Sequence, residues 1–420
     1  MTSGSETQLR RDLGLLDAVG VGFGAIVGAG IFVVTGVAAG IAGPAFLVGL
    51  VIAGIAATCN ALSAAQLAAE YPRSGGTYEY GYQVLNPWAG FTAGWLFLAS
   101  KIAAAGTVAL GLAGYLDTVL PGLRPRVVAV VAVVVFTIVN YFGIRRSSWA
   151  NLAIVAVSLG ALVTFVVAGM ASDSVRLDNL TPFAPAGWRG VLESGALLFF
   201  AYTGYARVAT LGEEVRDPRR TIPRAILVTI VGAVLLYVAV AFTAVGAVGA
   251  EPMSRTPAPL QVAAEGFGLP WVAVVVAIGG VAAMLGVILS QLLALSRMVY
   301  AMARQRDLPA FLGYVHPRYQ VPGRAVLVVG AIAAVVAAAG TLRGIASAAA
   351  FTILVYYGIA NLCALRMPRE AKLYSDWIPR LGFLSCVVLA LSLTAPVVFS
   401  GLAVLALGLG LRLVMLARHR

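Results

Sequence analysis

Charged residues are scarce in this chain: they make up 11% of its 420 residues, against about 25% in an average soluble domain. Hydrophobic residues account for 60%, and the mean hydropathy is +0.94. Apolar runs of roughly 18 or more residues, long enough to cross a bilayer, recur along nearly the whole sequence. This composition excludes an ordinary soluble protein and predicts an all-α polytopic membrane protein.

Cysteine and histidine are rare as well. Cys59, Cys363 and Cys386 lie in separate apolar runs without a CxxC pair, and His316 and His419 lie in polar segments. This pattern predicts neither a disulfide framework nor a metal site, and we expect no cofactor. The sequence also lacks the HExxH and GxSxG motifs and has no acidic pair within an apolar run. We therefore expect no catalytic residues and no enzyme activity.

Twelve membrane spans are expected from the apolar runs, and many of their ends coincide with proline. The predicted spans are 14–40, 44–70, 88–116, 127–143, 149–171, 190–212, 223–249, 270–304, 325–341, 344–366, 379–395 and 397–417.

Basic residues gather in alternate loops. With the N-terminus placed in the cytoplasm, 21 of the 29 Lys and Arg residues, Arg412 among them, fall in cytoplasmic segments, 6 fall in outer segments, and Lys101 and Arg207 lie within spans. The positive-inside rule then places both termini in the cytoplasm and the chain in the cytoplasmic membrane. This bias also explains the net charge of +12, so we expect no nucleic-acid partner. The outer loops hold Arg124, Arg126, Arg176, Arg189, Arg255 and Arg343.

The stretch "GAIVGAGIF", residues 24–32, places glycines in the middle of the first span. One interpretation is helix packing, because Gly20, Gly24 and Gly28 are four residues apart. Gly30 does not fit that face, since residues two apart point to nearly opposite sides of a helix. The other interpretation is a break in the helix, whose freed N–H groups bind an anionic group.

A second interruption is expected at Thr203-Gly204, in the middle of the sixth span. Breaks in spans one and six suggest two repeats of five helices with opposite orientation. The expected organisation is a cytoplasmic tail at 1–13, a first repeat at 14–171, a second repeat at 190–366 and two further helices at 379–417.

Four motifs occur in order along the chain: "GAIVGAGIF" (24–32), "YPRSGGTYEYGY" (71–82), "GEEVRDPRRTIPRAI" (212–226) and "SRMVYAMARQRDLP" (296–309). Together they resemble the amino acid–polyamine–organocation superfamily of transporters, over roughly residues 10–370. The resemblance implies the LeuT-type fold, with broken helices 1 and 6 and transport by alternating access.

The resemblance also implies a substrate site. The N–H groups of the first break would hold the α-carboxylate of an amino acid, and carbonyls of both breaks would hold its α-ammonium group. Phe200 would close the site from above, and Tyr202 would form a wall. The substrate-binding residues implied are Ile26, Gly28, Ala29, Gly30, Phe200, Ala201, Tyr202, Thr203 and Gly204.

Four further residues are candidates for coupling or gating. Lys101 lies near the middle of the third span, where a charge is costly, and it is either a proton switch or a structural lysine. Arg207 stays charged and suits a structural or gating role. Tyr205 follows the second break. Ser158 stands where proton-coupled members of the superfamily can carry a lysine, so it is a sodium ligand or the mark of an uncoupled exchanger.

The substrates expected are neutral L-amino acids, because no acidic residue lies clearly mid-membrane to pair with a cationic side chain. Transport would be proton-coupled or by exchange. A cationic amino acid or polyamine transporter is the first alternative, and an amino acid sensor with a transporter fold is the second.

Overall fold

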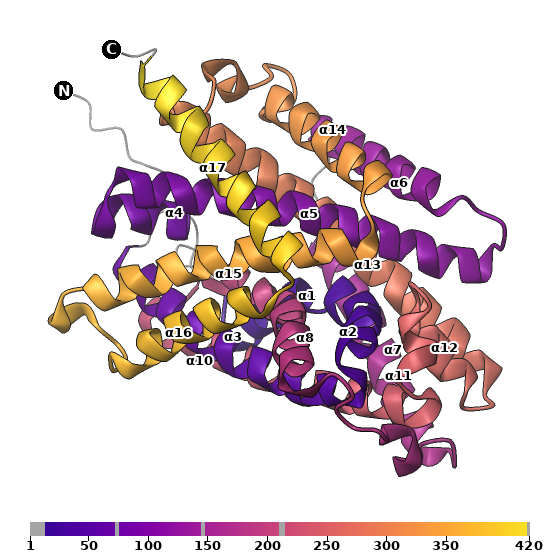
Figure 1. Ribbon diagram of the computed structural model, residues 1–420. Helices are drawn as coiled ribbons and strands as arrows, with labels where there is room; N and C mark the ends of the chain where they lie inside the picture. The colour runs from indigo at the N-terminus through magenta and orange to yellow at the C-terminus, as the bar shows by residue number, and fades with distance from the viewer. Residues whose placement is uncertain (1–12, 72–74, 144–147, 210–214, 418–420) are drawn as a thin grey trace.

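The computed structural model describes residues 13–71, 75–143, 148–209 and 215–417 (Figure 1). Within these ranges the chain is helical, and the one strand-like pairing is a bridge between Leu13 and Val215. The helices up to the second break are α1 (Leu15–Ile26), α2 (Thr35–Ala42), α3 (Phe46–Glu70), α4 (Thr77–Tyr80), α5 (Pro87–Val119), α6 (Pro125–Tyr141), α7 (Ser148–Ala171), α8 (Gly187–Tyr202) and α9 (Ala206–Ala209).

The later helices are α10 (Pro218–Val248), α11 (Ala250–Ser254), α12 (Pro259–Glu265), α13 (Pro270–Arg304), α14 (Gly323–Ala339), α15 (Leu342–Arg366), α16 (Trp377–Ser392) and α17 (Ala395–Ala417). Short π- or 3₁₀-helices connect some of them: η1 (Gly30–Val34), η2 (Gly43–Ala45), η3 (Gly81–Leu85), η4 (Leu177–Leu180), η5 (Thr203–Tyr205), η6 (Ala310–Gly313) and η7 (Arg369–Ala371).

Seven helical stretches of the described chain are long and apolar enough to cross a membrane, and α6, α14 and α16 are shorter apolar helices. Every predicted span coincides, over its described residues, with one of the helices or, in spans one and six, with a broken pair. Residues 210–212 of the sixth predicted span lie outside the described residues. The all-helical, membrane-spanning architecture expected from composition is confirmed. The number of spans and the repeat relationship stay predictions.

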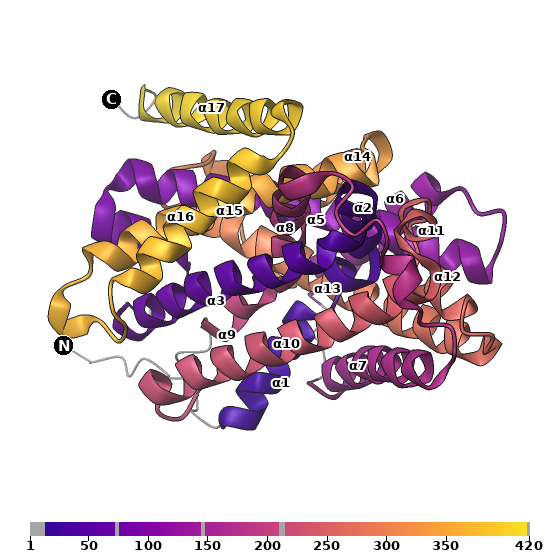
Figure 2. The same cartoon turned by 60° about the horizontal axis from the view of Figure 1, so that its bottom comes forward.

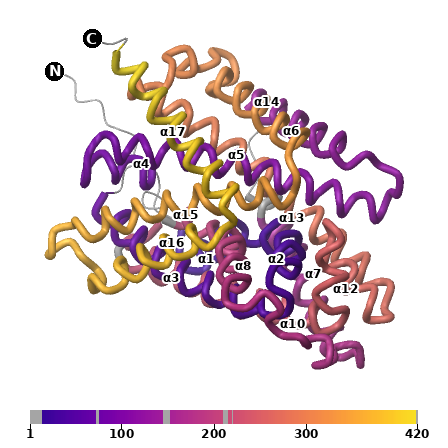
Figure 3. The backbone as a smooth tube through the Cα atoms, viewed as in Figure 1, coloured from indigo at the N-terminus to yellow at the C-terminus, as the bar shows by residue number. Residues whose placement is uncertain are grey.

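The long helices α5, α13 and α15 cross the molecule, and α5 packs against both of the others (Figure 1). On the other side, α3 packs against α8 and α10. α2 packs against α8, and the two lie side by side in the backbone tube (Figure 3). α1 packs instead against α10 and η5. α17 lies along the edge of the bundle (Figure 2).

The two ends of the molecule differ. α4 lies at one end, and α11 and α12 lie at the opposite end (Figure 1). Following the charge bias of the loops, we refer to the first as the cytoplasmic end and to the second as the outer end.

Glycine packing in the first span differs from the expected stripe. A Cβ on Gly20 would meet nothing within 4 Å, so Gly20 makes no close helix contact. Gly22 instead lies against Thr229 and Val208, where a Cβ would be 2.5 Å from the Thr229 hydroxyl oxygen. The packing interpretation was therefore wrong for Gly20.

Candidate substrate site at two helix breaks

The first break separates α1 from η1. α1 ends at Ile26, and Val27 is extended, with ψ at 112°. η1 then begins at Gly30 and continues directly into α2. The N–H groups of Ile31 and Phe32 both donate to the carbonyl oxygen of Gly28, at 3.2 and 3.3 Å.

The N–H groups at this break have no partner in the part of the chain that the structure describes. Within the described residues, no hydrogen-bond acceptor takes the N–H of Gly28, Ala29 or Gly30. All three residues are buried. Free donors at the start of a helix, together with the positive end of the helix dipole, form an anion-binding site. The first break therefore presents three buried N–H groups of the kind that bind an anion.

The second break lies directly against the first. α8 ends at Tyr202, the 3₁₀ turn η5 follows, and α9 begins at Ala206. A Cβ on Gly30 would lie 2.4 Å from the Cα of Ala201, and a Cβ on Gly204 would lie 2.1 Å from the carbonyl oxygen of Ala25. Two glycines therefore let the two broken backbones touch. Gly30 is needed for this contact because it has no side chain, whether or not its N–H also binds a ligand.

The carbonyl groups at the breaks are occupied, unlike the N–H groups. The hydroxyl of Tyr237 on α10 donates to the Ile26 carbonyl oxygen at 2.9 Å. The hydroxyl of Tyr357 on α15 donates to the Thr203 carbonyl oxygen at 3.4 Å. The Thr203 hydroxyl donates to the Phe200 carbonyl oxygen at 3.0 Å. The Phe200 carbonyl oxygen also accepts from the N–H of Thr203, so both of its lone pairs are used. The carbonyl oxygens of Ile26 and Thr203 each keep a second lone pair, which leaves room for one further donor.

The aromatic residues of α8 and η5 fill the surroundings of the breaks. Phe200 is buried, at 8% exposed. Tyr202 is fully buried, its hydroxyl donates to the Leu50 carbonyl at 3.3 Å, and its ring lies 5.4 Å from that of Tyr237. The ring of Tyr205 lies 5.4 Å from that of Tyr357. Tyr202 and Tyr205 thus pack against neighbouring helices in this conformation.

Lys101 lies half-buried on α5. Its Nζ is 5.8 Å from the centre of the Phe97 ring, and no carboxylate or hydrogen-bond acceptor of the described chain pairs with it. The Phe97 ring packs on Tyr356 at 5.5 Å, and Tyr356 packs on Tyr357. Two aromatic contacts therefore connect the lysine to the tyrosine that caps the second break.

Ser158 lies on α7 and Arg207 on α9. The Ser158 hydroxyl oxygen is 2.7 Å from the Ile154 carbonyl oxygen and 3.3 Å from that of Gly279 on α13. It therefore connects α7 to α13. Arg207 is exposed on α9.

A cavity of about 450 Å³ lies at the outer end, beside α2. Its lining includes Gly36, Gly40, Arg255 and Arg343 but no residue of either break. The residues of the first break are buried, and this cavity does not reach them. The described residues contain no cluster of histidine, cysteine or acidic groups that would hold a metal ion.

Sequence analysis missed the two tyrosines that cap the breaks. Tyr237 and Tyr357 lie in apolar runs without a recognisable motif, and no sequence signal separates them from ordinary packing aromatics. Only the folded arrangement brings them to the carbonyl oxygens of residues 26 and 203.

Comparison with known families matches residues 17–412 to the amino acid permease family. The chain is 45% identical over 416 residues to an uncharacterized transporter of Mycobacterium tuberculosis, covering 98% of this chain and 94% of the relative. It is 30% identical over 446 residues to the branched-chain amino acid permease BcaP of Bacillus subtilis, covering 100% and 95%. It is also 30% identical over 371 residues to the methylthioribose transporter of the same species, covering 82% and 80%.

Proposed function

This chain belongs to the amino acid permease family, within the amino acid–polyamine–organocation superfamily, and we propose that it transports neutral L-amino acids as a secondary active transporter. As a member of this family with several apolar helices, it is a multi-pass protein of the cytoplasmic membrane. The observation that carries the proposal is the set of three buried, unpartnered N–H groups at Gly28, Ala29 and Gly30.

The proposed binding mode uses the backbone alone for the common part of the substrate. The α-carboxylate accepts hydrogen bonds from the three N–H groups, and the α-ammonium donates to the carbonyl oxygens of Ile26 and Thr203. Since the same backbone groups meet any α-amino acid, they do not select the side chain. The choice between substrate side chains falls to the protein side chains around the breaks. Phe200 and Ala201, at the end of α8, directly precede the second break.

Alternating access is proposed to proceed through the LeuT-type arrangement, with two inverted repeats at 14–171 and 190–366. The touching breaks support this proposal, because a substrate held between two broken helices is released when the helices separate. The helices at 379–417 lie outside the repeats.

Neutral substrates are favoured by the pairing of the buried acids. Among the described residues, the buried carboxylates are Glu193 and Asp307. Arg343 contacts Glu193 at 3.2 Å, and Arg412 contacts Asp307 at 3.1 Å. Neither acid is available to a cationic side chain in this conformation, which argues against the cationic amino acid or polyamine alternative.

Proton coupling is proposed to involve Lys101. A lysine within the membrane without an acidic partner is costly when charged, so a cycle that protonates and deprotonates it would couple proton movement to transport. The aromatic contacts to Tyr356 and Tyr357 connect it to the second break. Exchange without net proton movement is the alternative.

Counterflow in proteoliposomes tests the function directly. Vesicles preloaded with unlabelled leucine should accumulate labelled leucine, and a pH gradient should drive net uptake if protons are coupled. Methylthioribose, a thioether sugar without carboxylate or ammonium, should neither exchange nor compete. Saturable binding of leucine without flux would identify the sensor alternative, and competition by lysine equal to that by leucine would identify the cationic one.

A further inference from the structure

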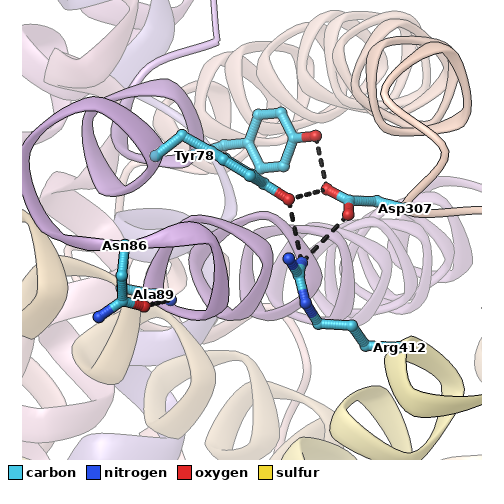
Figure 4. A network of polar contacts seen from close by, with 6 residues as sticks. Tyr78, Asn86, Ala89, Asp307 and Arg412 are labelled. Atoms are coloured by element: carbon cyan, nitrogen blue, oxygen red, sulfur yellow. Dashed lines mark hydrogen bonds and ion pairs between the residues drawn. The ribbon is translucent and has the colours of Figure 1, made fainter. Parts of the chain in front are cut away.

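The cytoplasmic end carries a buried polar network that the substrate site does not explain (Figure 4). Three of its four residues lie in the motifs at 71–82 and 296–309. Asp307 follows α13, and one of its oxygens, Oδ2, accepts hydrogen bonds from the hydroxyls of Tyr78 and Tyr82, at 2.7 and 2.6 Å. The other oxygen, Oδ1, accepts from Nη1 of Arg412 at 3.1 Å. The same Nη1 donates to the Tyr82 hydroxyl at 3.0 Å. Four residues from three distant parts of the chain therefore close one network.

Arg412 is held in place by ring stacking as well as by hydrogen bonds. Its guanidinium lies 5.0 Å from the ring of Trp88, 4.9 Å from Phe91 and 5.7 Å from Tyr82. Arginine suits this position because its planar group stacks on aromatic rings while its edge donates in fixed directions. With Arg412 5% exposed and Asp307 7% exposed, the pair is nearly dry, where such bonds are strong.

The rest of α17 explains why Arg412 reaches the network. The buried face of this helix consists of Gly401, Gly408, Arg412 and Met415. A Cβ on Gly408 would lie 2.4 Å from the Trp95 ring, so the helix lies directly on α5. Most of its other residues are exposed at the edge of the bundle (Figure 2).

Tyr78 and Tyr82 belong to a segment, residues 77–85, that we call the cap. Tyr80 of the cap packs with Leu67 and Ala68 at the end of α3 and with Cys363 and Met367 at the end of α15, in a small apolar cluster separate from the main core. The cap therefore covers the cytoplasmic ends of these two helices.

The cap also contacts the tyrosines that lead to the substrate site. The N–H of Thr77 donates to the Tyr356 hydroxyl at 3.3 Å, and Tyr356 packs on Tyr357, which caps the second break. Burial, followed by the hydrogen bond to Asp307, raises the pKa of Tyr82 to about 12. At cytoplasmic pH its hydroxyl is protonated and remains a donor to the carboxylate.

We propose that Arg412 is a positioning residue for the cytoplasmic side of the carrier: it fixes Asp307 so that Tyr78 and Tyr82 hold the cap closed over α3 and α15. Loss of the network lets the cap lift without unfolding the bundle. The proposal concerns the closed state of the cap and does not depend on which substrate is carried.

Cys363 is a built-in reporter for this movement. It is fully buried beneath the cap and is a free thiol. Cys386, a second buried free thiol, lies deeper, beside Asn60 on α3. Two single-cysteine backgrounds of the full chain separate cap opening from global unfolding: Cys59→Ala with Cys386→Ala leaves Cys363, and Cys59→Ala with Cys363→Ala leaves Cys386.

The experiment measures the rate of labelling by a membrane-permeant maleimide in each background. Tyr82→Phe removes two bonds of the network but no charge, and should raise the rate at Cys363 about tenfold, since a bond to a charged group is lost. The pair Asp307→Asn with Arg412→Gln should raise it at least as much. These two changes are combined because either alone leaves a buried charge without its partner, which by itself destabilises the fold.

Matched controls complete the design. Tyr319→Phe alters another half-buried cytoplasmic tyrosine outside the network and should leave both rates unchanged. Arg412→Lys keeps the charge but loses the fork and the stacking, and should give an intermediate rate at Cys363. In all variants the rate at Cys386 should stay within twofold of the parent. The proposal is overturned if Tyr82→Phe and the double variant label Cys363 no faster than Tyr319→Phe, or if the Cys386 rate rises in step with that of Cys363.

Discussion

The two helix breaks touch each other but expose opposite groups. At the first, three N–H groups are free of any partner in the described chain. At the second, and at the carbonyl that precedes the first, tyrosine and threonine hydroxyls already occupy the acceptors. A carboxylate would therefore meet donors without competition, whereas an ammonium group must share or replace a hydroxyl. On this basis the carboxylate should be the stricter requirement for binding.

The largest effect is expected where the two breaks touch. Gly204→Ala places a methyl group 2.1 Å from a backbone carbonyl oxygen, and the backbone cannot yield without separating the breaks. We expect loss of at least nine-tenths of leucine uptake and a lower melting temperature, measured in proteoliposomes and in detergent. Gly20→Ala, which meets nothing within 4 Å, is the matched control and should behave like the parent. Equal behaviour of the two variants would contradict the contact.

Ala29→Pro should isolate the donor role of the first break. Ala29 has φ at −57° and ψ at −21°, which suits proline, and its N–H has no partner among the described residues to lose. Removing one donor to a carboxylate should weaken leucine binding about tenfold to a hundredfold while the melting temperature without substrate changes little. Ala29→Ser adds bulk but keeps the N–H, and serves as the control. Unchanged affinity in Ala29→Pro would show that this N–H does not bind substrate.

Variants of Lys101 test whether the second break, to which aromatic contacts connect this lysine, takes part in proton coupling. Lys101→Met cannot carry a proton, so we expect about tenfold lower accumulation of leucine under a pH gradient, with counterflow retained. Lys101→Arg, which stays charged, should also lose pH-driven accumulation. Full proton-driven uptake by Lys101→Met would exclude the lysine from coupling.

The smallest effects are expected at the capping tyrosines. Tyr237→Phe leaves the buried Ile26 carbonyl without its donor, which should lower the stability of the substrate-free protein by about 1 kcal/mol. Leucine should then raise the melting temperature more than in the parent, because the ammonium replaces the lost donor. Tyr357→Phe should show the same pattern more weakly, since its bond is longer, 3.4 Å against 2.9 Å. A larger effect for Tyr357→Phe would reverse this ranking.

Glycine spacing indicated the breaks but not everything that the glycines do. The misfit of Gly30 to a single helix face predicted an interruption, and α1 does end two residues before Gly28. The close approach of Gly30 to Ala201 depends on a residue 171 positions away along the chain, which no local pattern contains. Gly30→Val therefore tests the contact between the breaks more than the anion site.

The pattern of charges along the sequence predicted the topology but not which charged residues pair with each other. The positive-inside bias placed Arg412 in a cytoplasmic segment as one of many arginines, yet its guanidinium lies in a buried network with Asp307. Lys101 was recognisable because a lysine in an apolar run stands out. Tyr237 and Tyr357 were not, because a tyrosine in a membrane helix is ordinary until its hydroxyl is seen to reach a carbonyl oxygen.

Competition for labelled leucine uptake by leucine and by leucine methyl ester is the most direct test of the central claim that the free N–H groups bind a carboxylate. Both compounds carry the ammonium group and the side chain, and only leucine carries the negative charge. The ester should compete at least a hundredfold more weakly in the parent protein, and this ratio should shrink in Ala29→Pro, whose donor set is reduced. Equal competition by the ester and by leucine in the parent would contradict the account.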